Sequence, residues 1–316
     1  MAVNIARIDY QGNTQWGRPS GESITLLPIP CTTTGELISA YSANELKSMN
    51  GPEVTLSHVK ILSPVTTNQQ FVCQGANYRQ HMIESGVDPD AKSFNMIFTK
   101  AASCICPADS PVIRPRHVTL LDYEVELGLV LKQTIESAID VSPESILDYV
   151  AGLVIVNDYS ARDIQIPQMQ FYKGKSFRTF GPVGPWLCLL EPGDDAYLLN
   201  LDLELKVDGE IRQRDNTSNL VFQPAETLTE LSGVQDFAPG DLLATGTPAG
   251  CALAAPSPRV QRLMGLIPEQ TKWRLFVNAQ SKRTQYLQPG QTVTTTIRSQ
   301  CGSIDLGTQT NRVVAE

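Results

Sequence analysis

The sequence has few of the side chains on which several common enzyme mechanisms depend. Only three histidines occur among 316 residues, so a multi-histidine zinc site would have to collect nearly all of them from distant parts of the chain. Neither a GxSxG nor a GxGxxG pattern is present, which leaves serine-hydrolase and dinucleotide-binding mechanisms without support. Any metal site in this chain should therefore be made of carboxylates.

Positive charge and long apolar runs are also scarce. The formal net charge is -8, which gives no basic field for the phosphates of a nucleic acid. No segment approaches the roughly 18 consecutive apolar residues of a membrane span, and the first ten residues lack the basic and apolar regions of a secretion signal. We expect a small-molecule partner, with neither nucleic acid nor membrane as a partner.

The cysteines bear on the compartment. Seven cysteines, an odd number scattered along a long chain, are typical of reduced thiols. The spacing of Cys104 and Cys106 is too short for a CxxC zinc or redox motif, so we interpret the cysteines as packing residues. These observations predict a cytoplasmic protein.

The pattern of turns and extended runs changes near residue 70. Residues 1–70 alternate short extended stretches with turns and one helical stretch at 34–48, which predicts a small N-terminal domain. Residues 71–316 contain many β-rich runs, with helices expected at 142–149 and 226–232. This favours an α+β fold with a β-dominated core and flanking helices. The polar stretch 256–283 is predicted to be an insertion on the surface.

The segment DYEVELGLV, residues 122–130, carries the strongest chemical signal. Residues two apart in a strand point to the same face, so Glu124 and Glu126 would project together. Two carboxylates that close repel each other unless a cation lies between them, and oxygen ligands suit Mg²⁺, Mn²⁺ or Ca²⁺. The alternative is that both glutamates form the solvent face of a half-exposed strand.

Two further segments offer acidic and basic groups. Asp158 follows the apolar run 151–156, where it is either a third carboxylate of the site or a turn residue. His81 and Glu84 are three apart and would share a helix face, so the carboxylate could orient an imidazole that acts as a base. A simple surface pair is the alternative.

Two glycine-rich segments complete the set of candidates. In KGKSF, Lys175 follows a glycine and could approach a bound oxyanion or enolate, whereas the glycine that a phosphate-binding loop requires five residues before Gly174 is replaced by Met169. In GDLLATGTPAG, a strand runs into a loop whose N–H groups and Thr247 hydroxyl could bind a substrate carboxylate.

Taken in order, these motifs resemble the fumarylacetoacetate hydrolase family over about residues 71–316. The resemblance is carried by NYRQH, DYEVELG, VNDYSARDIQ, KGKSFRTFGPVGP, GDLLATGTPAG and GSIDLGTQTNRV. It implies a mixed β-roll, usually a homodimer, with a smaller N-terminal domain. The stretch 256–283 is longer than in compact relatives.

The resemblance also assigns roles to individual residues. It implies Mg²⁺ or Mn²⁺ held by Glu124, Glu126 and Asp158, with His81 and Glu84 activating a water molecule. Lys175 would lie near the developing oxyanion or enolate, and Thr247 would bind the substrate carboxylate. The resemblance further implies that the pocket is lined by Tyr78, Arg79, Lys100 and Gln165.

Three functions follow from this set of residues. The first is hydrolysis of a C–C bond in a 1,3-dicarbonyl or acylpyruvate-like oxo acid, through a metal-bound enolate. The second is decarboxylation, isomerisation or cyclisation of a related 2-oxo acid, which needs the same enolate without attack by water. The third, a catalytically inactive binding protein, is disfavoured because the carboxylates, the histidine and the lysine are all present.

Overall fold

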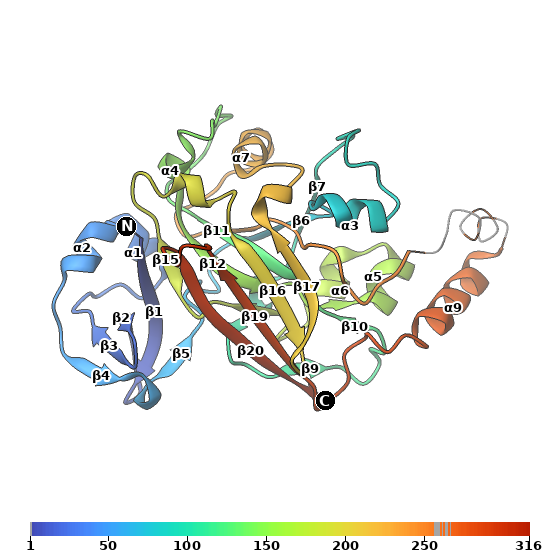
Figure 1. Ribbon diagram of the computed structural model, residues 1–316, viewed down its shortest axis with the longest axis horizontal. Coiled ribbons are helices and arrows are strands. Elements are labelled where there is room, and N and C mark those ends of the chain that lie inside the picture. Colours follow the sequence, from blue (N-terminus) through green and yellow to red (C-terminus); the bar gives the residue numbers. More distant parts are fainter. Residues whose placement is uncertain (1, 256–259, 261, 263–264, 266) are drawn as a thin grey trace.

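A computed structural model describes residues 2–255, 260, 262, 265 and 267–316 (Figure 1). The prediction of a strand-dominated α+β fold is confirmed. All seven cysteines are free; four are buried and two are half-buried, whereas Cys301 is exposed and is not the packing residue that we expected. Within the described ranges, no helix is long and apolar enough to cross a membrane.

The larger sheet runs through the middle of the molecule and has 13 strands. Its main path, in order of pairing, is β4 (Glu53–Thr55), β3 (Ser23–Leu26), β2 (Asn13–Ser20), β1 (Val3–Tyr10), β15 (Leu187–Leu189), β12 (Val150–Asn157), β11 (Val125–Leu131), β18 (Leu242–Ala244), β6 (Phe71–Gly75) and β7 (Met96–Thr99). Three strands lie off this path: β5 (Lys60–Leu62) pairs with β1, and β14 (Gly181–Val183) pairs with β12 and with β8 (Ile105–Pro107). The pairing of β1 with β15 joins the first strands of the chain to this sheet.

A second sheet crosses in front of the first (Figure 1). Its five strands are, in order, β17 (Glu210–Asn216), β16 (Asp202–Val207), β19 (Thr292–Arg298), β20 (Asp305–Ala315) and β9 (Val112–Arg114). The short strands β10 (Leu121–Asp122) and β13 (Ser160–Ala161) pair separately.

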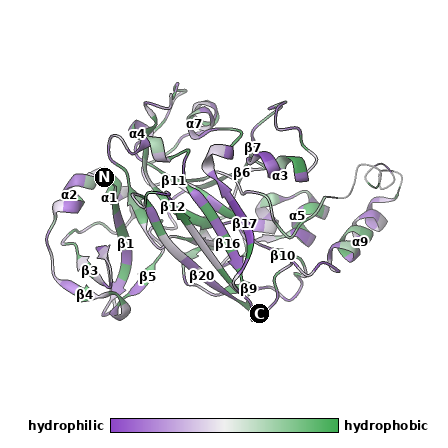
Figure 2. Cartoon of the chain, viewed as in Figure 1, coloured by the Kyte–Doolittle hydropathy of each residue, from purple (hydrophilic) through white to green (hydrophobic). Residues whose placement is uncertain are grey.

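The helices lie around these sheets. In the part of the chain that the structure describes, the α-helices are α1 (Thr34–Ala40), α2 (Ala43–Ser48), α3 (Arg79–Glu84), α4 (Ile146–Tyr149), α5 (Arg162–Gln168), α6 (Phe171–Lys175), α7 (Pro224–Ser232) and α9 (Glu269–Gln280). In Figure 1, α1 and α2 accompany the N-terminal strands, α3, α5 and α6 lie on the opposite side, and α9 projects furthest from the sheets. Helix α9 carries both hydrophilic and hydrophobic residues (Figure 2).

The central strands β11 and β12 are buried along their whole length. Leu127 on β11 packs in a cluster with residues of the second sheet such as Leu205, whereas Val154 on β12 packs in a cluster with Trp16 and Leu37 of the N-terminal part. Both faces of the strand pair are therefore covered, which explains why their sequences read as nearly continuous apolar runs.

Two predicted helices have different limits in the structure. The expected helix at 34–48 is two helices, because Ser42 and Glu45 form a second capping box that begins α2. The expected helix at 142–149 begins only at Ile146, because Ser142 and Ser145 hydrogen-bond to each other's backbone in a turn. Part of the predicted insertion at 256–283 lies outside the described residues, and α9 forms much of the remainder. The division of the chain near residue 70 stays a prediction.

Candidate active site

Three carboxylates meet where β11 and β12 pair. Each of Glu124, Glu126 and Asp158 offers one oxygen, and these oxygens lie within 4.8 Å of one another. Val125 pairs with Asn157 across the two antiparallel strands. This pairing brings Glu124 and Glu126, which flank Val125, close to Asp158, which follows Asn157. The backbone N–H of Asp158 donates to the carbonyl of Glu124 at 2.8 Å, which fixes the two side chains at one end of the strand pair.

The strand begins at Val125, whereas we expected Glu124 to lie within it. Because β11 starts at Val125, Glu124 precedes the strand. The backbone N–H of Glu124 donates to the side-chain oxygen of Asn157 at 3.0 Å. Glu124 is 5% exposed, Glu126 1% and Asp158 0%. A solvent-facing strand would leave its glutamates exposed, so these values exclude that alternative.

Cationic side chains already contact two of the three carboxylates. The Nζ atom of Lys175 lies 2.7 Å from Glu124 and 2.7 Å from Asp158. Lys100 forms an ion pair with Asp158 and donates to the carbonyl of Phe180 at 2.7 Å. Burial raises the pKa of Glu124, but the charges of Arg162 and Lys175 outweigh this effect and lower it to about 2.

Glu126 differs from its two neighbours in forming no ion pair in the described part of the chain, although the charge of Lys175 acts on it from a longer distance. Its carboxylate accepts a hydrogen bond from the N–H of Gly246 at 2.9 Å. Gly246 has a φ of +89°, a conformation that favours glycine, and a Cβ there would lie 2.8 Å from the side chain of Asn77. Burial, and then the charges of Asp158 and Glu124, raise the pKa of Glu126 well above its ordinary value.

The chemistry of this donor set fits a divalent cation. The buried cluster contains one more carboxylate than cationic groups: Asp122, Glu124, Glu126 and Asp158 against Lys100, Arg162 and Lys175. The excess charge falls on Glu126, which needs either a proton or a cation to be stable in this buried position. Glu124, Glu126 and Asp158 could therefore hold a hard metal ion through oxygen atoms.

Lys175 is placed by the packing of two short helices. Gly174 precedes it on α6, and a Cβ at that glycine would lie 2.7–2.9 Å from atoms of Gln165 on α5. Glycine therefore allows α6 to approach α5 closely, which carries Lys175 to the carboxylates. Although burial lowers the pKa of Lys175, Asp158 and Glu124 more than offset this effect and raise it, so the lysine stays charged.

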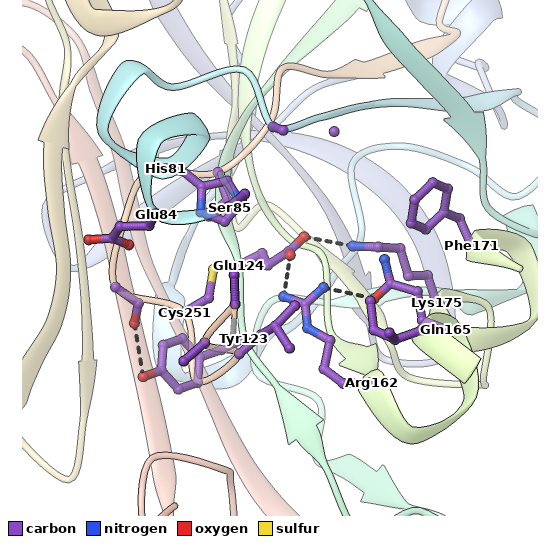
Figure 3. Close-up of a pocket in the computed structure, with 18 of the residues that line it drawn as sticks. His81, Glu84, Ser85, Tyr123, Glu124, Arg162, Gln165, Phe171, Lys175 and Cys251 are labelled. Carbon is purple, nitrogen blue, oxygen red and sulfur yellow. Dashed lines mark hydrogen bonds and ion pairs between the residues drawn. The ribbon is translucent and has the colours of Figure 1, made fainter. Parts of the chain in front are cut away.

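Glu124 and Glu126 line a cleft of about 740 Å³. Figure 3 shows Glu124 between Lys175 and Arg162, with His81 of α3 and Ser85, the residue after α3, near them. Of the residues predicted for the site, the cleft is lined by His81, Glu84, Glu124, Glu126, Gln165, Lys175 and Thr247. Seven of the eleven predicted site residues thus share one cavity.

His81 and Glu84 lie on the α3 side of this cleft. The His81 side chain is half-buried, and Glu84 is exposed, with its carboxylate directed away from Glu124 in Figure 3. Within the described ranges no hydrogen bond joins the two side chains. Burial lowers the pKa of His81, while the negative charge of Glu124 works in the opposite direction. The imidazole is therefore largely neutral at pH 7, as a base must be.

Four predicted residues lie deeper than the cleft or away from it. Asp158 and Lys100 form a buried ion pair with each other, and neither is among the residues that line the cleft. Tyr78 is fully buried, and its hydroxyl has no hydrogen-bond partner among the described atoms. Arg79 instead forms an exposed ion pair with Asp90 at 2.7 Å, on another part of the surface.

The side chains of Gln165 and Thr247 are held by protein atoms. Gln165 accepts a hydrogen bond from Arg162 at 2.8 Å. The Thr247 hydroxyl donates to the carbonyl of Val125 and accepts from Gln213, both at 2.9 Å. The Thr247 hydroxyl therefore has no proton left to donate to a ligand. A ligand could accept hydrogen bonds from the backbone N–H groups of this loop, or donate one to the second lone pair of the hydroxyl.

Sequence reasoning assigned no role to Asp122 and Arg162. Arg162 is buried, lies 2.8 Å from Asp122 and forms a second ion pair with Glu124. Asp122 in turn accepts hydrogen bonds from the N–H groups of Ala252 at 2.7 Å and Leu253 at 3.0 Å. The sequence signal that could have identified them is their position, because Asp122 lies in the motif of Glu124 and Arg162 lies in the motif of Asp158.

The family described as fumarylacetoacetate (FAA) hydrolase C-terminal matches residues 70–314. The chain belongs to this family. The resemblance inferred from the motifs is therefore confirmed, and the protein is an enzyme of the fumarylacetoacetate hydrolase family. A relative from Burkholderia lata, whose name assigns it provisionally to the hydrolases, is 39% identical over 191 residues. That match covers 60% of this chain and 65% of the relative, so the chain spans about two thirds of its length.

Solved structures of the family share the fold. The fumarylacetoacetate hydrolase of Exiguobacterium antarcticum is 28% identical, with a TM-score of 0.74 over 99% of this chain and 100% of that one. A maleylpyruvate hydrolase from Sphingobium, solved with manganese(II) and pyruvate, is 21% identical, with a TM-score of 0.71 and 99% of each chain covered.

Proposed function

We propose that this enzyme hydrolyses a carbon–carbon bond of an acylpyruvate-like 1,3-dicarbonyl acid, with Mg²⁺ or Mn²⁺ held by Glu124, Glu126 and Asp158. The observation that carries the proposal is Glu126, a buried carboxylate that lies beside two others and forms no ion pair in the described part of the chain. Manganese in the Sphingobium relative agrees with this choice of metal.

The bound metal would act as a Lewis acid that polarises the oxo acid. The residues of this chain would supply the remaining chemistry. Lys175 lies where a charged ammonium group can stabilise negative charge that develops on the substrate. His81 would take a proton from water, and Glu84 would favour the protonated imidazole through its charge. Gln165 would contact the oxo acid from the cleft wall.

Decarboxylation, isomerisation or cyclisation of a related 2-oxo acid is the second candidate. It is favoured by one observation, namely that no hydrogen bond joins His81 to Glu84 within the described residues, whereas Lys175 contacts two carboxylates directly. A reaction that only forms and protonates an enolate depends on the carboxylates and the lysine, and it needs no activated water.

A substrate panel distinguishes the two candidates. The metal-supplemented protein is incubated with several acylpyruvates and with oxaloacetate, and loss of enol absorbance and release of CO₂ are followed together. Hydrolysis predicts loss of acylpyruvate absorbance with two carboxylic acids as products. Release of CO₂ from oxaloacetate with intact acylpyruvates would overturn the hydrolase proposal. Glu126→Gln protein, matched in size at the site, shows whether either signal belongs to this cluster.

We also propose that the protein is a homodimer, as the family resemblance implies. Light scattering coupled to size-exclusion chromatography tests this directly. A mass near twice 34.6 kDa is the expected result, and a mass near 34.6 kDa at all concentrations would contradict it.

A further inference from the structure

Three arginines of the described residues line the cleft, and they differ in how their charges are compensated. Arg162 forms ion pairs with Asp122 and Glu124. Arg212 pairs with Glu210 at 3.0 Å. Arg283 has no acidic partner among the residues that the structure describes, although it lines the same cleft as the carboxylates. An arginine in a partly enclosed cleft without a counter-charge is well placed to receive an anion.

We propose that Arg283 binds a second, distal carboxylate of the substrate, so that the enzyme prefers dicarboxylic oxo acids. This inference rests on the proposed function, in which the oxo-acid end of the substrate lies at Glu124, Glu126 and Asp158. It extends that function by naming the chemical class of the other end.

The guanidinium group of Arg283 is oriented by the backbone. Its Nε atom donates to the carbonyl of Ala252 at 2.9 Å. This bond restricts the side chain and leaves the two Nη groups without a partner in the described chain. A planar guanidinium group that presents free N–H groups matches a carboxylate in geometry as well as charge.

The backbone that holds Arg283 is itself fixed to the buried cluster. The N–H groups of Ala252 and Leu253 donate to the two carboxylate oxygens of Asp122, at 2.7 and 3.0 Å. Gln280 adds a second attachment, because its side chain donates to the carbonyl of Ala254 at 2.9 Å. Arg283 therefore projects from a segment held rigidly relative to the carboxylates, as a recognition site requires.

Apolar side chains line the same cleft as Arg283. They include Leu253 and Phe276 of α9, which is 6% exposed. Apolar side chains reduce contact with water, so a charge pair formed there is stronger than one in open solvent. The hydrocarbon part of a substrate would also gain from these contacts.

Matched pairs of oxo acids test the inference without requiring turnover. Calorimetry on the Mn²⁺-supplemented protein compares 2-oxoglutarate with 2-oxopentanoate, and 2-oxoadipate with 2-oxohexanoate; the members of each pair differ only in the distal carboxylate. We expect the dicarboxylate of at least one pair to bind about tenfold more tightly or better, as for a hydrogen bond to a charged group. The same preference should appear in the inhibition constants if the acids inhibit hydrolysis.

Substitutions then assign the preference to one side chain. Arg283→Gln should abolish it and leave the affinity for the monocarboxylates within twofold, whereas Arg283→Lys should retain part of it. Arg212→Gln is the matched control, because this arginine lines the cleft but already has an acidic partner, and it should keep the preference. Thermal denaturation shows whether each variant is folded.

Three outcomes would overturn the inference: no preference in the wild type, an undiminished preference in Arg283→Gln, or no binding of any of the four acids. Failure of the proposed function looks different. If acylpyruvates are not hydrolysed but the dicarboxylates still bind more tightly through Arg283, the hydrolase proposal falls and the recognition site remains.

Discussion

The Nζ atom of Lys175 lies 2.7 Å from Oδ2 of Asp158, so a lysine and a proposed metal ligand share one buried ion pair. The same ammonium group lies 2.7 Å from Glu124. Lys175 and a divalent cation would therefore compete for the same two carboxylates. Removing the lysine should affect metal binding and catalysis differently, so its two roles can be measured separately.

Replacing Lys175 by Met should not weaken Mn²⁺ binding, because the substitution removes a positive charge from beside the ligands. Activity should fall by about a hundredfold or more, the usual effect of losing a group that stabilises developing charge. Calorimetry and steady-state kinetics give the two values. Lys173→Met, on the exposed side of α6, is the control. Substantially weaker Mn²⁺ binding by the Lys175 variant would show that the lysine organises the ligands.

Glu126 and Glu124 should differ in their effect on the metal-free protein. Glu126→Gln removes a charge that has no described cationic partner, so the free energy of unfolding should stay constant or increase. Glu124→Gln breaks buried pairs with Arg162 and Lys175, and a loss of about 3–5 kcal/mol is expected. Both variants should lose metal affinity.

Urea denaturation in the presence of EDTA measures this difference. Equal destabilisation by the two substitutions would mean that Glu126 is compensated in solution, and the argument for a cation at this position would lose its basis.

Much of the site could be predicted because it follows from strand pairing and short motifs. Glu124 and Glu126 were predicted to lie together from their spacing, and they do, although the strand begins only after Glu124. Asp158 could be placed beside them because it follows a buried strand. Local preferences alone left open whether Asp158 is a turn residue or a ligand, and the family's motifs favoured the ligand.

The remaining features depend on contacts between distant parts of the chain. The motifs contain Asp122 and Arg162, but they do not show that Arg162 joins Asp122 to Glu124, since 40 residues separate Arg162 from Asp122. Nor do they indicate that Arg79 pairs with Asp90 on the outer surface while its neighbour Tyr78 is fully buried. Arg283 lay in a stretch predicted to be surface insertion, yet it lines the cleft. Side-chain direction at such positions is set by tertiary packing.

The pH dependence of activity should report His81. Burial keeps its pKa below the ordinary value of about 6.5, so a base that must be neutral remains active as the pH falls, and activity is lost only below that value. His81→Ala should reduce hydrolysis by about a hundredfold and remove this acidic limb, with Mn²⁺ affinity unchanged. Glu84→Gln should cause a smaller loss.

Profiles of kcat/KM against pH for the three proteins give this comparison. Undiminished hydrolysis by the His81 variant would show that this histidine is an ordinary rim residue. Substantial exchange of the substrate's α-proton with D₂O in that variant, with hydrolysis lost, would show that enolate formation needs only the carboxylates and Lys175.

The central claim is that the three buried carboxylates hold a catalytic divalent metal, and a metal titration tests it most directly. Enzyme stripped with EDTA is titrated with Mn²⁺ while hydrolysis of an acylpyruvate is measured, in parallel with Glu126→Gln protein. We predict no turnover without metal, recovery of activity that saturates near one Mn²⁺ per chain, and no comparable recovery in the variant. Full turnover by verified metal-free enzyme would contradict the account, because the carboxylate cluster would then be a structural ion-pair network.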